Sequence, residues 1–166
     1  GTTSKLKGVP ISQSSLLQTN GYIIASNLGL SASDTCYSIM PLFYIGGIRA
    51  SILCSIAAGG SICCDSQAYN PENVIDELAL SDPKPTWWYS SVPTIHNATV
   101  SYMRDMAATS DKLKSYGVNE NGIWKDGHSL RMIRSGAAAL RGPDAINLTN
   151  AFGGIPIIPT YSMSEQ

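Results

Sequence analysis

The stretch Thr86-Trp87-Trp88-Tyr89-Ser90-Ser91-Val92 gives the clearest strand signal in this chain. Aromatic and β-favouring residues fill it, and Pro85 and Pro93 bound it on either side. A helix is predicted directly after it, from Pro93 to about Ala107. A strand that leads at once into a helix is typical of folds in which the two elements alternate.

The same alternation continues on both sides of this stretch. Helices are predicted at about 12–27, 48–58, 71–80 and 143–152, and strands at 34–40, 61–64, 130–134 and 155–158. Residues 109–127 are polar and glycine-containing without a clear period, so we expect a surface excursion within one domain. The sequence therefore predicts an α/β fold with a mostly parallel sheet, right-handed crossovers and helices on both faces.

Composition limits the classes of protein to which the chain can belong. A hydrophobic content of 43% with 14% charged residues excludes a disordered chain. The net charge of −1 favours neither nucleic acid nor an anionic membrane surface as a partner, and no apolar run is long enough to span a membrane. The four cysteines lack zinc spacing, so we expect reduced, largely buried thiols. These features predict an intracellular protein in the cytoplasm, with a peroxisomal location left open.

The first residues, Gly1-Thr2-Thr3-Ser4-Lys5-Leu6-Lys7-Gly8-Val9, have the make-up of a loop that wraps a polyphosphate. Glycine lets backbone N–H groups approach a phosphate, hydroxyls donate hydrogen bonds to it, and Lys7 adds a compact positive charge. The alternative is an ordinary polar turn, because these residue types are common in surface loops and the Walker pattern is missing.

Four segments, in order, resemble motifs of the adenylate-forming superfamily, which includes acyl-CoA ligases and peptide-synthetase adenylation domains. The opening loop resembles the family's nucleotide-phosphate loop, although Ser4 stands where glycine is commoner and Leu6 where proline is usual. The other three are Pro41-Leu42-Phe43-Tyr44-Ile45-Gly46-Gly47, Ser135-Gly136-Ala137-Ala138-Ala139-Leu140 and Tyr161-Ser162-Met163-Ser164-Glu165. The resemblance covers nearly the whole chain and implies part of the large N-terminal domain of such an enzyme.

The resemblance implies a reaction of ATP with a carboxylic acid that gives an acyl-adenylate and pyrophosphate. The acyl group then passes to a thiol, of coenzyme A or of a carrier protein's pantetheine. Implied catalytic residues are Lys7, Ser164 and Glu165, and Glu165 also holds Mg²⁺, a cation that prefers carboxylate oxygen. Implied nucleotide-binding residues are Gly1, Thr2, Thr3, Ser4 and Lys7 at the phosphates, Ser135, Gly136, Ala137 and Ala138 under the adenine, and Thr160, Tyr161, Ser162 and Ser164 around the rest of the nucleotide.

Tyr44, Gly46 and His96 are the implied substrate-binding residues. Tyr44 stands where the family usually has histidine, and tyrosine cannot carry a positive charge. The run from Thr86 to His96 resembles both the small-acid and oxalate–CoA ligase branch and fungal-type peptide-synthetase-like adenylation domains. A polar group at His96 suits a short or second-carboxylate acid. A structural role for His96 is the alternative, and the other histidine, His128, is expected to face solvent.

The matching region ends at Glu165, and the family's ribose-binding aspartate, hinge and C-terminal domain are not found in this sequence. We therefore expect residues 1–166 to be a partial AMP-binding domain with little activity alone. Three functions stay open: an acyl-CoA ligase, an adenylation domain of a carrier-protein assembly line, and a non-catalytic nucleotide-binding remnant.

Overall fold

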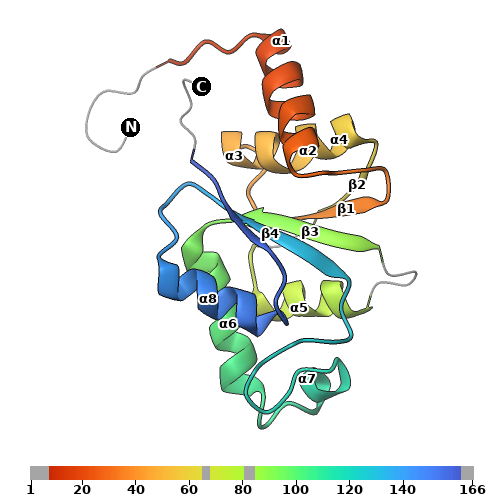
Figure 1. Ribbon diagram of the computed structural model, residues 1–166, viewed down its shortest axis with the longest axis vertical. Helices are drawn as coiled ribbons and strands as arrows, with labels where there is room; N and C mark the ends of the chain where they lie inside the picture. The colour runs from red at the N-terminus through yellow and green to blue at the C-terminus, as the bar shows by residue number, and fades with distance from the viewer. Residues whose placement is uncertain (1–7, 65–67, 81–84, 162–166) are drawn as a thin grey trace.

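A computed structural model describes residues 8–64, 68–80 and 85–161 (Figure 1). Its centre is a five-stranded sheet in the order β2-β1-β3-β4-β5, with every neighbouring pair of strands parallel. The strands are β1 (Asp34–Ser38), β2 (Ser61–Cys64), β3 (Thr86–Ser91), β4 (Leu130–Ser135) and β5 (Ile157–Pro159). The predicted parallel sheet is confirmed.

Helices cover both faces of this sheet, as the sequence predicts. One face carries two continuous helical segments, α1 (Gln13–Ser15) with η1 (Leu16–Ile23) and α2 (Ile24–Asn27), and α3 (Ile45–Gly47) with η2 (Ile48–Leu53) and α4 (Cys54–Ala58). The other face carries α5 (Pro71–Leu80), α6 (Pro93–Met106) and α8 (Gly142–Ala151), with the short α7 (Asp111–Ser115) below them (Figure 1). Both η segments are π-helical, with wider turns than an α-helix.

Local chemistry explains where the helices begin. The Ser12 hydroxyl accepts a hydrogen bond from the Ser15 N–H at 3.0 Å and caps α1. The Asn70 side chain accepts from the Glu72 N–H at 2.9 Å, and Pro71 occupies the first position of α5. Proline is tolerated there because its missing N–H has no partner inside the helix.

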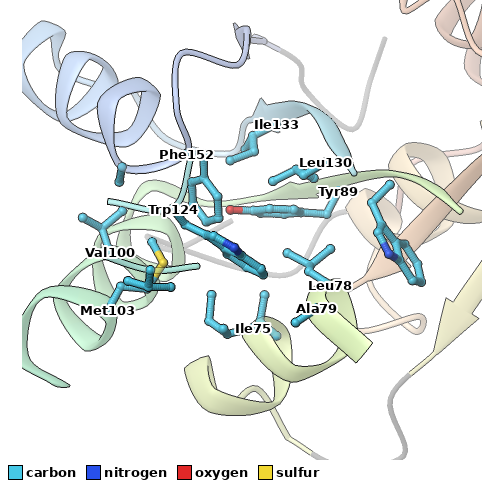
Figure 2. Packing of buried hydrophobic residues seen from close by; sticks show 14 of the residues in the cluster. Ile75, Leu78, Ala79, Tyr89, Val100, Met103, Trp124, Leu130, Ile133 and Phe152 are labelled. Atoms are coloured by element: carbon cyan, nitrogen blue, oxygen red, sulfur yellow. The ribbon is translucent and has the colours of Figure 1, made fainter. Parts of the chain in front are cut away.

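Strand residues alternate between two hydrophobic cores. In β3, Trp87 and Tyr89 enter the larger core on the side of α5, α6 and α8, whereas Trp88 enters the smaller core beneath α2 and α4. Figure 2 shows the larger core, in which Tyr89 and Trp124 lie among aliphatic side chains. A sheet that is buried on both faces needs apolar residues at consecutive positions, which explains the uninterrupted aromatic run.

The segment 109–127 is more than the surface excursion expected from its polarity. It contains α7, and the side chains of Leu113, Val118 and Trp124 are almost fully buried in the larger core. The Trp124 indole N–H donates to the Tyr116 carbonyl at 2.8 Å, which satisfies its polar edge inside the core. The expectation was wrong because these buried residues sit on turns and a short helix, where no period of 2 or 3.6 develops.

His128 does not simply face solvent, which corrects a second expectation. It is half-buried, its Nε2 lies 2.9 Å from the Trp124 carbonyl, and its Nδ1 accepts from the Leu130 N–H at 3.1 Å. The imidazole therefore links the segment 109–127 to the start of β4.

Smaller differences concern element ends and thiols. β1 stops at Ser38 rather than residue 40, and β5 begins at Ile157 rather than residue 155. All four cysteines are free thiols, but Cys64 is exposed, so the expectation of buried thiols is wrong at that position. Within the described ranges, no helix has both the length and the apolar character needed to cross a membrane.

Candidate functional site

A cavity of about 220 Å³ lies where the carboxyl ends of the strands meet the first two helical segments. Met40 follows β1, Val92 follows β3, Gly136 follows β4 and Thr160 follows β5, and all four line it. Clefts at this edge are the usual ligand sites of parallel α/β sheets, because the loops that follow the strands diverge there. The full lining is Asn20, Ile24, Met40, Tyr44, Ile45, Gly46, Arg49, Ala50, Ser90, Ser91, Val92, Arg134, Gly136, Ala137 and Thr160.

A second hollow, of about 570 Å³, adjoins the first. Ala137 and Thr160 line both, so the two share one wall. The second hollow is bounded by small side chains and by Tyr161, which is 87% exposed. Its lining is Ser135, Ala137, Ala138, Ala139, Leu140, Pro159, Thr160 and Tyr161. The two hollows lie past the ends of β3, β4 and β5, and their size suits a small ligand.

The shared wall is held in place by backbone hydrogen bonds between strand ends. The Gly136 N–H donates to the Ser91 carbonyl at 3.0 Å, and the Thr160 N–H donates to the Ser135 carbonyl at 2.7 Å. A Cβ atom on Gly136 would lie 2.8 Å from the Thr160 Oγ1, so any other residue there would have to displace the Thr160 hydroxyl. Ala137 has a φ of +63°, a left-handed conformation that costs about 1 kcal/mol or more for a residue other than glycine. Such strain is typical of binding loops.

Two arginines from different elements line the first cavity. Arg49 comes from η2 and is only 8% exposed, and Arg134 comes from β4. The Arg134 guanidinium donates to the Ser90 hydroxyl at 3.3 Å. Burial lowers the pKa of Arg134 below its usual value, but a guanidinium stays protonated at neutral pH. This part of the cavity is therefore positively charged.

Asn20 adds a polar group from η1. Its side chain is 5% exposed, and its amide donates to the Ser15 carbonyl at 3.1 Å. Asn20 and Arg49 thus both lie on π-helical segments, which are frequent at functional sites because the wider turn shifts a side chain out of the normal helical register.

The cavities bring together most of the predicted residues that lie in the described part of the chain. Tyr44 and Gly46 line the first cavity, and Tyr44 is about half exposed beside it. The predicted nucleotide-binding residues fall on the shared wall and the second hollow: Ser135, Gly136, Ala137, Ala138, Thr160 and Tyr161. Gly1, Thr2, Thr3, Ser4, Lys7, Ser162, Ser164 and Glu165 lie outside the described residues.

His96 lies apart from both hollows. It is 0% exposed in the first turns of α6, with its ring centroid 5.6 Å from that of Tyr89. Burial lowers its pKa to about 4, and no hydrogen bond of ordinary geometry reaches either ring nitrogen, although the nearby Ser91 backbone opposes the shift weakly. His96 is therefore neutral at physiological pH.

Sequence reasoning missed the polar residues of the first cavity, Asn20, Arg49, Ser90 and Arg134. Arg49 carried a usable signal, because it is the only charge in an otherwise apolar helical segment. Among the described residues, no group of three or more histidine, cysteine, aspartate or glutamate side chains could hold a metal ion.

The strained turn at Ala137 and the charged cavity lie at the carboxyl edge of a parallel sheet, where α/β proteins usually bind small ligands. The chain matches the family described as AMP-binding enzyme over residues 1–166, and it belongs to that family.

Named relatives agree with this membership, and a solved structure shares the fold. An oxalate–CoA ligase from Arabidopsis thaliana and a probable CoA ligase from Humulus lupulus, CCL9, are each 30% identical over 99% of this chain. The chain spans 28% of the length of each. The crystal structure of apo MatB from Rhodopseudomonas palustris has the same fold, with a TM-score of 0.76 and 18% identity over 99% of this chain and 28% of that one.

Proposed function

We propose that the protein containing this chain is an AMP-forming acid–thiol ligase. It joins a small carboxylic acid to ATP as an acyl-adenylate, releases pyrophosphate, and passes the acyl group to coenzyme A. The observation that carries the proposal is the wall shared by the two hollows, Ala137 and Thr160. An acid in the first cavity and a nucleotide in the second would meet there.

The second hollow suits the nucleoside. Its small side chains leave a flat surface against which a purine could stack, and the 87% exposed Tyr161 offers an aromatic ring beside it. Ser135, Gly136, Ala137 and Ala138 are proposed to lie under the adenine, with Thr160 at the junction. The hydrogen bonds from Gly136 to Ser91 and from Thr160 to Ser135 hold this surface before the nucleotide arrives, so binding costs little ordering.

The chemical difficulty is that an anionic carboxylate must attack an anionic nucleotide. Positioned donors and cations are needed to hold like charges together and to neutralise the charge that develops. We propose that Gly1, Thr2, Thr3, Ser4 and Lys7 bind the outer phosphates, and that Ser164, with Ser162 nearby, contacts the α-phosphate. Glu165 is proposed to hold Mg²⁺, which would screen the phosphate charges. Tyr44, Gly46 and His96 are proposed for the acid side.

Coenzyme A is the proposed acceptor because the two relatives above are named as CoA ligases. The pantetheine of a carrier protein offers the same thiol, and the experiment below distinguishes this acceptor from coenzyme A. The cytoplasm is the proposed location.

The test uses the full protein, including any residues that are encoded on either side of these 166. Exchange of labelled pyrophosphate into ATP is measured with a panel of short acids, and each reaction is repeated with chelator. We expect exchange that requires both an acid and Mg²⁺, and thioester formation when coenzyme A is added. Lys7→Met and Glu165→Gln should each lower exchange by about 100-fold or more.

Arg104→Gln is the control, because Arg104 is exposed on α6 and bonds only to the Asn147 side chain among the described residues, at 2.7 Å. It should leave exchange unchanged. ATP binding without exchange on any acid would instead indicate a nucleotide-binding remnant. If the thioester forms on a carrier protein but not on coenzyme A, the chain is instead part of an assembly-line adenylation domain.

A further inference from the structure

A third hollow, of about 550 Å³, borders the first cavity. Met40, Ser91 and Val92 line both spaces, so these three residues form a partition between them. Ser91 is the last residue of β3, Val92 is the N-cap of α6, and the Ser91 hydroxyl lies 3.9 Å from the Met40 sulfur. The partition is therefore built largely from the turn between β3 and α6, and the position of that turn sets one wall of the first cavity.

The turn has no strong local reason to hold one position. Val92 occupies the N-cap, and valine has no side-chain oxygen with which to cap the helix. The next residue, Pro93, has no N–H to donate. The turn is closed by backbone bonds from the Ile95 and His96 N–H groups to the Val92 carbonyl, at 3.0 and 3.2 Å. A first turn of this kind gains most from a hydrogen bond that comes from another element.

Tyr69, which lies just before α5, supplies such a bond. Its hydroxyl donates to the Ile95 carbonyl at 3.1 Å and lies 2.9 Å from the Thr99 hydroxyl. The Thr99 hydroxyl also donates to the Ile95 carbonyl, at 3.1 Å, and Thr99 is fully buried. Tyr69 and Ile95 both line the third hollow, so this three-membered network stands directly behind the partition.

We propose that Tyr69 is a positioning residue for the acid: by holding the first turn of α6, it fixes Ser91 and Val92 and so sets how closely the acid fits the first cavity. Tyr69 does not line that cavity and acts only through the partition. Neither Tyr69 nor Ile95 lines the second hollow, so the nucleotide should be unaffected. This inference rests on the proposed ligase function.

Tyr69→Phe tests the proposal, because it removes the hydroxyl and keeps the ring. Acid-dependent pyrophosphate release is measured on the full protein, with the acid that it activates best. We expect KM for the acid to rise by about 3- to 10-fold, the loss that corresponds to one hydrogen bond. The kcat and the KM for ATP should stay within about 2-fold of the unchanged protein, since only the fit of the acid is altered.

Thr99→Val, which keeps the shape of the side chain and removes its hydroxyl, should raise KM for the acid in the same way. The double variant Tyr69→Phe with Thr99→Val should be no worse than the poorer single variant, because both changes break one network. If Tyr69→Phe does not fold, Thr99→Val decides alone.

Tyr116→Phe is the matched control. The Tyr116 hydroxyl donates to the Asp76 carboxylate on α5 at 3.1 Å, and Tyr116 lines none of the three spaces. The same substitution there should leave KM for the acid unchanged. Urea unfolding of both variants shows how much stability each hydroxyl contributes.

The outcomes separate the two proposals. If no acid is activated by the unchanged protein, the ligase function fails and this inference fails with it. If acids are activated but Tyr69→Phe leaves KM for the acid unchanged, the function stands and Tyr69 is a structural residue only. An equal rise in KM for Tyr116→Phe would also refute the proposal, because a general loosening of the fold would then explain both.

Discussion

Arg131 on β4 forms an ion pair with Asp34 on β1, with 2.5 Å between Nε and Oδ1, although β3 lies between the two strands. The same guanidinium donates to the Gly29 carbonyl at 3.1 Å, and Asp34 accepts from the Ser31 N–H at 2.8 Å. Burial alone would raise the pKa of Asp34, but the hydrogen bonds from Arg131 and Ser31 outweigh it and hold that pKa below its ordinary value. This ion pair joins the amino-terminal ends of β1 and β4, at the edge of the sheet opposite the cavity.

Arg131→Met should lower the free energy of unfolding at pH 7 by about 2 kcal/mol. The loss is smaller than for a fully buried pair because the Arg131 side chain is 34% exposed and water screens it. A carboxylate with a lowered folded-state pKa stabilises the fold above its unfolded-state value, near 4, and loses that contribution as pH falls. Urea unfolding should therefore show a smaller difference between the variant and the unchanged protein at pH 3 than at pH 7. An equal difference at both pH values would contradict this account of the pair.

Trp124→Ala should destabilise the protein by about 3–5 kcal/mol, the usual loss for a buried tryptophan. Trp124 is 0% exposed and its indole satisfies the Tyr116 carbonyl, so the substitution leaves both a cavity and an unpaired acceptor. Ile146→Ala on α8 is the control, because Ile146 is 64% exposed and should change stability little. Thermal unfolding followed by circular dichroism compares the two. Similar melting temperatures for both variants would mean that the segment 109–127 contributes nothing to the core.

Gly47→Ala should cost about 1–3 kcal/mol and disturb the cavity wall at Tyr44 and Gly46. A Cβ atom on Gly47 would lie 2.3 Å from the Pro41 carbonyl oxygen, so the backbone must move. Gly142→Ala is the matched control, since a Cβ there meets no atom within 4 Å at the start of α8. Urea midpoints measured side by side test the difference. A Gly47→Ala protein as stable as Gly142→Ala would show that the close approach does not constrain this turn.

His96 should make stability depend on pH between about 6.5 and 4. Its folded-state pKa of about 4 lies below the unfolded value, so the unfolded chain binds a proton first as pH falls. Stability from this residue is intact above pH 6.5 and decreases by roughly 3 kcal/mol on approach to pH 4. Urea unfolding at a series of pH values should show a shallower slope for His96→Gln than for the unchanged protein. Parallel slopes would indicate that His96 is protonated in the folded state.

The order of strands and helices could be predicted because its signals are local. The residues Trp87 to Tyr89 put aromatic side chains on both faces of one strand, and the Asn70 side chain and the Pro71 ring mark a helix start. The burial of Trp124 could not be predicted in this way. It depends on contacts with Tyr116 and Phe152, which are not neighbours of Trp124 in the sequence.

The candidate site was predictable in part, since the motif residues Tyr44 and Gly46 line the first cavity but its polar residues Asn20 and Arg49 were missed. The small residues Ser135 to Ala138 form a recognisable run, and they lie on the shared wall and the second hollow. Arg49 and Asn20 lie on π-helical segments and line the first cavity, and the sequence pattern alone does not distinguish a π-helical turn from an α-helical one.

The central claim is that the carboxylate itself attacks the α-phosphate of ATP, and isotope transfer tests it most directly. The full protein is given ATP, coenzyme A and the short acid that it activates, with its carboxylate oxygens labelled with ¹⁸O, and the released AMP is examined by mass spectrometry. We expect one labelled oxygen in each AMP, because the thiol displaces AMP together with an oxygen of the activated carboxylate. Product thioester accompanied by unlabelled AMP, or by ADP and phosphate, would contradict the account.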